Sequence, residues 1–331
     1  MKKILNDPVD YVDEMLDGLC AAHPEFYAQP TPRVITRAGG ATAGKVGIVT
    51  GGGSGHLPIF TGYVGKGLLD ACAIGDVFSS PSADQMAEAM RHASAGRGVL
   101  RLYGNYGGDV MNFDMAGEML MMEDVDSTTV LLADDVASAG PEEAEKRRGV
   151  AGMVYAFKCA GAKAEELAEL AEVTRVAQKT ADACRSIGMA LTPCTVPQAG
   201  TPTFEIAEDE MEMGMGIHGE PGIWRDKLRK ADEITDEMMD RLFADMPIGS
   251  GDRVSILVNS LGATPPEELY IMYRHAKARL DDAGATIVMP LVGRYGTSME
   301  MAGATITLCK LDDELEALLK APADCAYWTV G

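Results

Sequence analysis

The chain has 331 residues, of which 47% are hydrophobic and 24% charged, so it is long enough to bury a large core and to form two α/β domains. Its formal net charge of -21 argues against a nucleic-acid partner, because contacts to phosphates need clustered Lys and Arg side chains. No apolar run approaches the roughly 20 residues that span a bilayer, and no basic amphipathic segment indicates a membrane surface.

The first residues and the cysteines indicate a cytoplasmic protein. The start MKKILNDPVDYVDEML is charged and lacks the apolar centre of a signal peptide. The chain has seven cysteines, an odd number, and no Cys-x-x-Cys pair. We therefore expect buried, reduced thiols rather than disulfides.

Strands alternate with helices in the first half of the chain. Strands are predicted at residues 45–50, 68–75, 98–105 and 128–135, and helices at 81–93 and 112–122. Two longer helical stretches follow, at 142–161 and 164–188, and residues 164–187 are expected to form a helix between two domains. This alternation is typical of an α/β sheet.

The second half repeats the alternation with its own elements. Strands are predicted at 189–195, 211–217, 253–262 and 286–293, and helices at 231–246, 265–284 and 312–322. The predicted fold class is α/β, with two domains that each contain a mixed sheet flanked by helices. We place the first domain at residues 1–185 and the second at 186–331, and expect the tail, about 320–331, to pack against the first.

A glycine-rich segment, VTGGGSGH, follows the strand at 45–50 and ends at His56. It does not fit the patterns of a nucleophile elbow, a dinucleotide fingerprint or a P-loop, so no nucleotide site is predicted on this chain. A glycine-rich turn still leaves backbone N–H groups free to donate to a small polar ligand. The alternative is a structural corner without a ligand.

A second loop, LYGNYGGDVMNFD, places Asp109 after a strand and just before a helix expected to begin near Met111. Asp109 either caps that helix or presents a carboxylate at the carboxyl end of the strand, where open α/β sheets bind ligands. In the third segment, MEMGMGIHGEPG, the alternating residues Met211 to Ile217 predict a half-buried strand with His218 on its glycine face. Glycines within a strand indicate a close approach to the backbone, here beside His218.

Other polar groups are more ordinary. The segment RRGVAG contains Arg147 and Arg148, which could bind a phosphate but are better explained as a surface turn. The histidines at positions 23, 92 and 275 lie in polar helical contexts and are expected to be solvated.

Taken together, these segments resemble the dihydroxyacetone kinase family, and specifically its substrate-binding K component. The resemblance rests on NDPVDYVDEMLDGLCAAHPE, GKVGIVTGGGSGHLP, GYVGKGLLDACAIGDVFSSPS, NYGGDVMNFDMA, RRGVAG and EMGMGIHGEPG, in order along nearly the whole chain.

The resemblance implies a set of site residues. His218 would bind the substrate's carbonyl covalently as a hemiaminal, and His56 and Asp109 would act on the hydroxyl that is phosphorylated. The predicted substrate-binding residues are Gly53, Ser54, Gly55, Ser80 and Gly104, and no metal site is predicted on this chain.

The resemblance also implies partners. The phosphoryl donor, ADP or ATP with Mg²⁺, would lie on a separate helical L-type component, with a phosphotransferase-system protein as a further candidate donor. A homodimer is expected. The alternative function is a catalytically silent ketose sensor that acts through a protein partner.

Two residues depart from the family pattern. Leu57 replaces an acidic residue after the glycine-loop histidine, and Gly104 replaces a lysine that contacts the substrate. We expect the loss of the lysine to leave room for a substrate larger than dihydroxyacetone, such as the four-carbon ketose erythrulose. The alternative is that Arg101, Tyr103 or a water fills the space.

Overall fold

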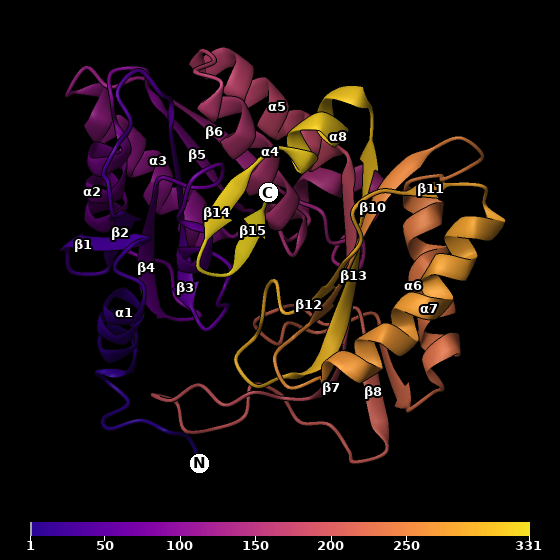
Figure 1. Ribbon diagram of the computed structural model, residues 1–331. Helices are drawn as coiled ribbons and strands as arrows, with labels where there is room; N and C mark the ends of the chain where they lie inside the picture. The colour runs from indigo at the N-terminus through magenta and orange to yellow at the C-terminus, as the bar shows by residue number, and fades with distance from the viewer. Residues whose placement is uncertain (1) are drawn as a thin grey trace.

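A computed structural model describes residues 2–331 of the chain. Figure 1 shows two sheets side by side, with helices on the outer face of each and further helices between them. Each outer face has an apolar core of its own, and a third core lies between the sheets.

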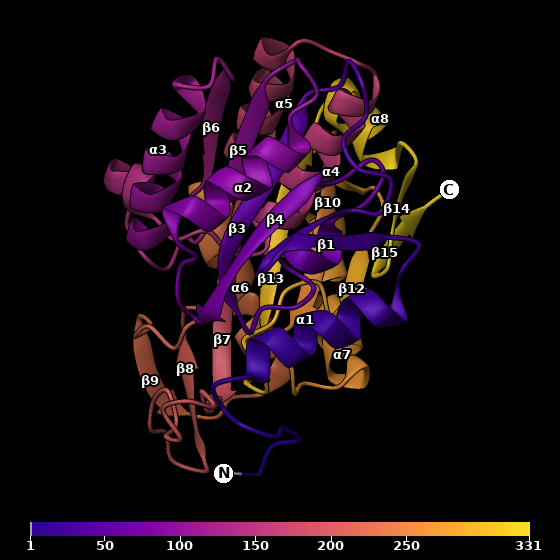
Figure 2. The ribbon, with the colours of Figure 1, turned by 90° about the vertical axis from the view of Figure 1, so that its left-hand side faces the viewer.

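The first sheet has six strands in the order β1-β2-β4-β3-β5-β6. Strands β4, β3, β5 and β6 are parallel, whereas β1 and β2 pair in antiparallel fashion at one edge. Helices α2 and α3 pack on the outer face, and α1 crosses near β1 (Figure 2). The bounds are α1 Tyr11–Ala22, β1 Tyr27–Thr31, β2 Val34–Arg37, β3 Gly47–Ser54, β4 Ala71–Val77, α2 Ala83–Ala93, β5 Val99–Gly104, α3 Gly107–Met121 and β6 Ser127–Leu132.

The second sheet has the order β11-β10-β13-β7-β8-β9, and β12 also pairs with β10. It is mainly antiparallel, because only β11 and β12 run parallel to their neighbour β10. Helices α6 and α7 cover its outer face. The bounds are β7 Cys184–Thr192, β8 Glu210–Met213, β9 Trp224–Lys227, α6 Ala231–Asp245, β10 Arg253–Ser260, α7 Pro266–Asp282, β11 Thr286–Ile287, β12 Leu291–Gly293 and β13 Ala302–Leu311.

Between the sheets lie α4 (Gly152–Glu165) and α5 (Leu170–Asp182), with α8 (Asp313–Lys320) against α4. The C-terminal hairpin of β14 (Ala323–Cys325) and β15 (Trp328–Val330) lies against the first sheet's loops, where Lys66 pairs with Asp324. Short 3₁₀ helices occupy Thr61–Tyr63 and Pro141–Lys146. Within residues 2–331, no helix has both the length and the apolar character needed to cross a membrane.

The predicted fold class, mixed sheets flanked by helices, is confirmed. The proposed division into residues 1–185 and 186–331 stays a prediction, although the second sheet does begin at Cys184. The predicted helix at 164–187 is wrong at both ends, because residues 164–165 are the end of α4 and α5 extends only from Leu170 to Asp182. Residues Cys184 to Ile187 belong to β7, where they pair with β13, and the apolar side chains of Cys184 and Ile187 are fully buried there.

The helical stretch predicted at 142–161 is interrupted. A 3₁₀ helix ends at Lys146, and α4 begins only at Gly152. The residues between them, including Arg147 and Arg148, are extended or turned, and their side chains form ion pairs with other segments. These tertiary contacts override the helical propensity of the sequence.

The glycine-rich turn predicted after residue 50 is also wrong in its first part. Strand β3 continues through Gly51, Gly52 and Gly53 to Ser54, in register with β4. A Cβ atom on Gly52 would lie 2.2 Å from the ring of Phe60, and one on Gly53 would lie 2.7 Å from the Cα of Phe78. The glycines are therefore required by close packing on the strand, and the turn begins only at Gly55, whose φ is +104°.

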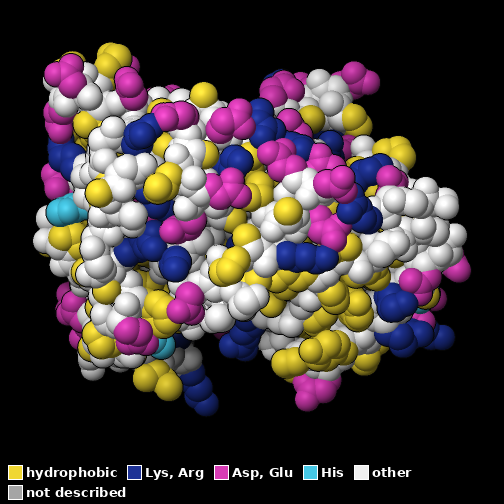
Figure 3. Space-filling view, turned by 45° about the horizontal axis from the view of Figure 1, so that its top comes forward, with side chains coloured by type: hydrophobic (Ala, Val, Ile, Leu, Met, Phe, Trp, Pro, Cys, Tyr) yellow, Lys and Arg dark blue, Asp and Glu magenta, His cyan; other side chains and the backbone are white. Residues whose placement is uncertain are grey.

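The surface contains many charges of both signs. On the face that Figure 3 turns forward, Lys and Arg side chains lie beside Asp and Glu side chains rather than in a patch of their own. Ion pairs from Arg175 and Lys179 of α5 to Glu314 of α8 are examples of this pairing.

Candidate functional site

Loops at the carboxyl ends of three parallel strands meet a loop of the second sheet. His56 follows β3, Ser80 follows β4, and Asp109 lies in the first turn of α3 just after β5. Carboxyl ends of parallel strands are the usual ligand-binding edge of an open α/β sheet. The loop that follows β8 brings His218 to the same place, with ring centroids of His218 and His56 4.8 Å apart.

His56 is a neutral hydrogen-bond acceptor. Its Nδ1 lies 2.7 Å from the backbone oxygen of Thr297, and because a carbonyl oxygen only accepts, Nδ1 must be the protonated nitrogen. Burial, together with the nearby charge of His218, lowers the pKa of His56 to about 3. Its Nε2 is buried and has no hydrogen-bond partner in the described part of the chain. Buried acceptors are almost always satisfied, so this nitrogen fits a hydroxyl of a bound ligand.

Asp109 is a buried carboxyl group held by a serine. The residue is 7% exposed, and its Oδ1 accepts a hydrogen bond of 2.6 Å from the Ser80 hydroxyl. Burial raises the pKa of Asp109 to about 6, although the Ser80 hydrogen bond and the His218 charge oppose the rise. A carboxyl group with a pKa near neutrality is suited to general acid–base chemistry.

Helix α3 begins at Gly107, earlier than the expected start near Met111. Asp109 is therefore inside the first turn of the helix rather than its cap. Its backbone position beside Ser80 depends on Gly108, where a Cβ atom would lie 3.2 Å from the Cβ of Ser80.

His218 is oriented by Glu220. Its Nδ1 lies 2.8 Å from Glu220 Oε1, and its backbone N–H donates to Glu220 Oε2 at 3.0 Å. Burial would raise the pKa of Glu220, but the hydrogen bond and charge of His218 outweigh it and lower the value to about 2. An ionised carboxylate only accepts, so it favours a proton on Nδ1 and leaves the Nε2 lone pair free.

Strand β8 ends at Met213, so His218 is not on a strand as the Met alternation predicts. Gly214 has a φ of +82° and turns the chain out of the sheet. Met215 and Ile217 remain buried, which explains why the apolar pattern extends past the end of the strand. The segment ends in a tight turn in which the amide of Gly219 donates to the carbonyl of Gly216 at 3.1 Å.

Two further aromatic rings enclose His218. The centroids of Phe78 and Tyr106 lie 5.2 Å and 4.8 Å from its centroid, both in edge-to-face geometry. Phe78 also stacks on His56 at 4.9 Å, and it does so with a φ of +58°, a region that favours glycine. Strained backbone of this kind costs about 1–3 kcal/mol and is concentrated at functional sites.

The predicted substrate-binding residues are distributed unevenly. Ser80 contacts Asp109, whereas Gly53 and Ser54 belong to β3 and Gly55 forms the turn before His56. Gly104 is buried at the end of β5. A Cβ atom there would lie 3.1 Å from the Tyr106 ring and 3.3 Å from the Met153 sulfur, so these two side chains fill the space that we expected to be open.

Leu57 lines a cavity of about 650 Å³ on the other side of this turn, together with Ser54, Gly55, Arg294, Thr297 and Met299. Neither His218 nor Asp109 lines that cavity. This cavity is therefore distinct from the candidate site, which is defined by the two histidines and Asp109.

Three residues of the site were not singled out from the sequence: Phe78, Tyr106 and Glu220. The available signal for Glu220 was its position two residues after His218 in a glycine-containing segment. Arg147 and Arg148, considered as phosphate ligands, are instead engaged by Asp245 and Asp135. Arg147 is buried, with 1% of its side chain exposed, so it is not on a surface turn.

The arrangement combines an imidazole nitrogen with a free lone pair, a neutral acceptor and a carboxyl group of raised pKa. The first can add to a carbonyl carbon, the second can accept from a hydroxyl, and the third can take a proton. Among residues 2–331 there is no cluster of three or more His, Cys, Asp or Glu side chains arranged to hold a metal ion.

Comparison with known proteins gives close matches over the whole chain. The Dak1 domain family matches residues 17–327. A protein from Listeria innocua, the dihydroxyacetone-binding subunit DhaK of PTS-dependent dihydroxyacetone kinase 2, is 43% identical over 100% of both chains. The L-erythrulose 1-kinase of Mycolicibacterium smegmatis is 42% identical, and the match covers 100% of this chain but 58% of that protein.

Solved structures with the same fold include an enzyme and a regulator. The dihydroxyacetone kinase of C. freundii is 30% identical, with a TM-score of 0.90 and coverage of 99% of this chain and 60% of that chain. The dihydroxyacetone kinase operon co-activator Dha-DhaQ is 31% identical, with a TM-score of 0.87, and the match covers 94% of this chain and 96% of that chain. The family match and the identity over the full length confirm the resemblance to the dihydroxyacetone kinase family: the chain belongs to the Dak1 domain family.

Proposed function

We propose that this protein is the ketose-binding subunit of a dihydroxyacetone-type kinase, a phosphotransferase that phosphorylates a terminal hydroxyl of a short ketose. The observation that supports this best is the pairing of His218 with Glu220, with Nδ1 bound at 2.8 Å and Nε2 left free. The family membership and the names of the relatives agree with it.

In this proposal the ketose is held covalently. The Nε2 lone pair of His218 forms a bond to the carbonyl carbon, the π electrons move to the oxygen, and that oxygen takes a proton from solvent. The product is a hemiaminal, and the positive charge left on the imidazole is offset by Glu220 through Nδ1–H. A triose offers little area for binding, so a covalent bond supplies the orientation that contacts alone cannot.

The terminal hydroxyl is positioned and activated by the other two groups. His56 Nε2 accepts a hydrogen bond from the substrate, because this nitrogen has no partner within residues 2–331. Asp109 takes the hydroxyl proton, because its pKa of about 6 leaves it mostly ionised at neutral pH and yet makes it a stronger base than an ordinary carboxylate. The oxygen then attacks the phosphoryl group of the donor.

The donor is placed on another component. We propose ADP or ATP with Mg²⁺ on an L-type partner, which a phosphotransferase-system protein can recharge, and a homodimer of this chain in the cytoplasm. The chain spans the whole of the Listeria subunit but little more than half of the L-erythrulose 1-kinase. Mixing this chain with and without a purified L-type partner tests the proposal, since turnover from ATP by the isolated chain would contradict it.

The substrate is proposed to be dihydroxyacetone or a related short ketose, with a four-carbon ketose such as erythrulose used at least as well as the triose. Tyr106 and Met153, rather than a lysine, cover the end of β5 beside Gly104. With Gly104 in place of a lysine, the end of β5 lacks a charged donor, and a hydrogen bond from such a donor is worth about 1.5–3 kcal/mol.

A panel of three- to five-carbon ketoses, assayed for kcat/KM with the partner present, tests this preference. Tenfold or greater selectivity for dihydroxyacetone over every larger sugar would contradict it. The variant Gly104→Lys is expected to move the ratio toward the triose, provided that Tyr106 shifts to admit the new side chain.

Covalent binding is tested by ¹³C NMR with dihydroxyacetone labelled at the carbonyl carbon. The expected result is loss of the carbonyl resonance and appearance of a tetrahedral carbon when the protein is in excess. His218→Ala should abolish the new resonance. His275→Ala is the matched control, because His275 pairs with Asp236 on α6 and lies outside the site. Equal adduct formation by His218→Ala would end the hemiaminal proposal.

The sensor alternative is less well supported, since this chain has Asp109 and His56 as well as the carbonyl-binding histidine. The fold alone does not discriminate, because a co-activator shares it. Asp109→Asn separates the two functions: the kinase proposal expects the adduct to persist while turnover with the partner is lost.

A further inference from the structure

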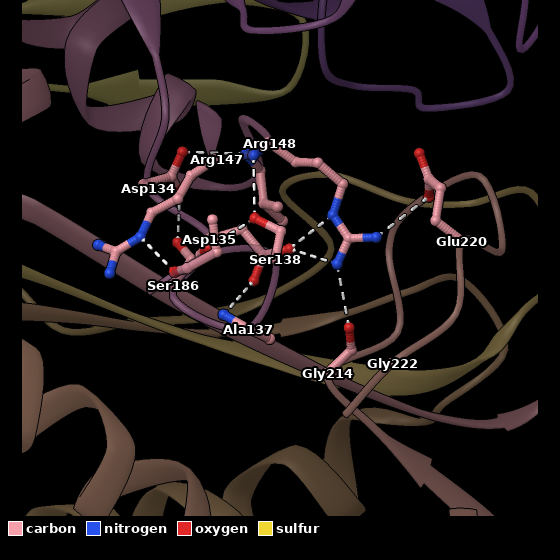
Figure 4. A network of polar contacts seen from close by, with 12 residues as sticks. Asp134, Asp135, Ala137, Ser138, Arg147, Arg148, Ser186, Gly214, Glu220 and Gly222 are labelled. Atoms are coloured by element: carbon pink, nitrogen blue, oxygen red, sulfur yellow. Dashed lines mark hydrogen bonds and ion pairs between the residues drawn. The ribbon is translucent and has the colours of Figure 1, made fainter. Parts of the chain in front are cut away.

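Arg148 is held in place from several directions beside the site (Figure 4). Its Nε donates to Asp135 Oδ2 at 3.0 Å, and its Nη2 lies 2.9 Å from the same oxygen. Nη2 also donates to the carbonyl of Gly214 at 3.1 Å, and the backbone N–H of Arg148 donates to Ser138 Oγ at 3.0 Å. With 14% of its side chain exposed and its partner Asp135 at 2%, the guanidinium has a fixed position.

The remaining nitrogen of Arg148 faces the carboxylate that orients His218. Nη1 lies 3.9 Å from Glu220 Oε2, the same oxygen that accepts the backbone N–H of His218. The close approach depends on Gly216. A Cβ atom on Gly216 would lie 2.1 Å from Glu220 Oε2 and 2.6 Å from Arg148 Nη1.

These contacts join the two sheets. Asp135 and Arg148 lie between β6 and α4, whereas Gly214 and Glu220 belong to the loop after β8. The other end of that loop is fixed by Glu212, whose carboxylate accepts from the amide of Gly222 at 2.6 Å. Arg148 therefore contacts the first residue of the loop, Gly214, and approaches Glu220, so its contacts lie on both sides of His218 in the sequence.

From this geometry we infer that Arg148 is the positioning residue of His218. Its fixed guanidinium, 3.9 Å from Glu220 Oε2, keeps the Glu220 carboxylate turned toward the imidazole, so that Nδ1 holds the proton and Nε2 remains a free nucleophile. Glu220 is 32% exposed and can rotate into solvent once the guanidinium is gone. The chemical benefit of this arrangement rests on the proposed function, but the arrangement itself is measurable without any ketose.

The experiment compares Arg148→Gln with Arg148→Lys and with the matched control Arg147→Gln. Arg147 is the neighbouring residue, and its side chain is 1% exposed. Two of its guanidinium nitrogens pair with Asp245 and not with the His218 loop, so Arg147→Gln removes the same charge from the same segment. The primary readout is ¹⁵N NMR of the His218 ring in ketose-free protein between pH 5 and 9, which reports the tautomer directly. The second readout is the apparent Kd for carbonyl-labelled dihydroxyacetone.

Arg148→Gln is expected to give a mixture of tautomers and an apparent Kd at least tenfold higher. Arg148→Lys should recover part of both effects, because it keeps the charge but not the forked contacts. Arg147→Gln should lower the unfolding midpoint without changing the tautomer. In a Glu220→Gln background, adding Arg148→Gln should change the tautomer no further.

Unchanged His218 resonances in Arg148→Gln, or equal changes in Arg147→Gln, would overturn the inference. The two proposals fail in different ways. If the parent protein forms no ketose adduct, the proposed function is wrong, while the NMR comparison still decides the role of Arg148.

Discussion

Replacing Ser80 by alanine removes the hydroxyl that donates to Asp109 at 2.6 Å. Burial raises the pKa of Asp109 to about 6, and this hydrogen bond is one of the two interactions that limit the rise. Without it, the ionised form of the carboxyl group loses a donor, and the pKa should rise further. In the proposed mechanism Asp109 acts in its ionised form, so the acidic limb of the pH–rate profile should move to higher pH.

The size of the shift follows from the hydrogen bond. A hydrogen bond to a charged group contributes about 1.5–3 kcal/mol, and one pKa unit corresponds to about 1.4 kcal/mol. The limb is therefore expected to move by about one to two units, from near pH 6 to about pH 7–8. His56 does not contribute a limb in this range, because its pKa is about 3.

The assay is kcat/KM with the L-type partner between pH 5 and 9, since this quantity reports ionisations of the free enzyme. The control is Ser82→Ala, which removes the hydroxyl that caps α2 through the amide of Gln85 and does not contact Asp109. It should lower stability by about 1 kcal/mol and leave the limb in place. A limb that stays near pH 6 in Ser80→Ala, or one that moves equally in Ser82→Ala, would refute the assignment to Asp109.

Three further substitutions have expected outcomes: two change the pH dependence of stability, and one changes the loop that carries His218. The pKa of Asp109 is raised from 3.8 to about 6, so the folded state binds more protons than the unfolded state between these pH values. The unfolding free energy therefore falls as pH rises through this range. Asp109→Asn should stabilise the protein by up to about 3 kcal/mol at pH 7, measured by chemical denaturation. Lys158 is buried with its Nζ 2.7 Å from the carbonyl oxygen of Leu318, and burial lowers its pKa to about 8. The unfolded state therefore binds more protons than the folded state from pH 8 to about 10.5, and the unfolding free energy should rise with pH in that range. Lys158→Met should remove this pH dependence. Gly216→Ala should abolish the ketose adduct seen by ¹³C NMR while Gly249→Ala, where a Cβ meets nothing within 4 Å, should not.

The elements that the sequence predicted well are those with one apolar face. Helices α6 and α7 begin and end within a few residues of their predicted bounds, because each lies on the outside of a sheet and alternates apolar with charged residues. Strand β13 was missed although it is the longest strand of its sheet. Its residues Ala304 to Leu308 do alternate apolar side chains with threonine, so the sequence carried a period-two signal for this strand. The threonines are nevertheless buried, because both faces of this central strand are covered.

The residues of the candidate site were chosen from the sequence because their chemistry is conspicuous there. His56, Asp109 and His218 stand out because each lies in a glycine-rich segment near the end of an apolar run. Glu220 did not, because its role arises only when the loop folds back over Gly216 and brings the carboxylate to the imidazole. Contacts that depend on the relative placement of two sheets are set by tertiary structure, and a local pattern does not report them.

In the proposed mechanism the two histidines of the candidate site have similar geometry but different chemical roles. Each places a partner on Nδ1 and leaves Nε2 free, but the partner is the carbonyl of Thr297 for His56 and the carboxylate of Glu220 for His218. A carbonyl carries no net charge, so buried His56 stays neutral and its Nε2 can accept a hydrogen bond but is too weak a base to hold a proton near pH 7. A carboxylate offsets the positive charge that develops when an imidazole nitrogen adds to a carbonyl, which favours His218 as the nucleophile. The proposed mechanism therefore assigns proton removal to Asp109, the acidic group of the three, whose pKa lies within about one unit of neutrality.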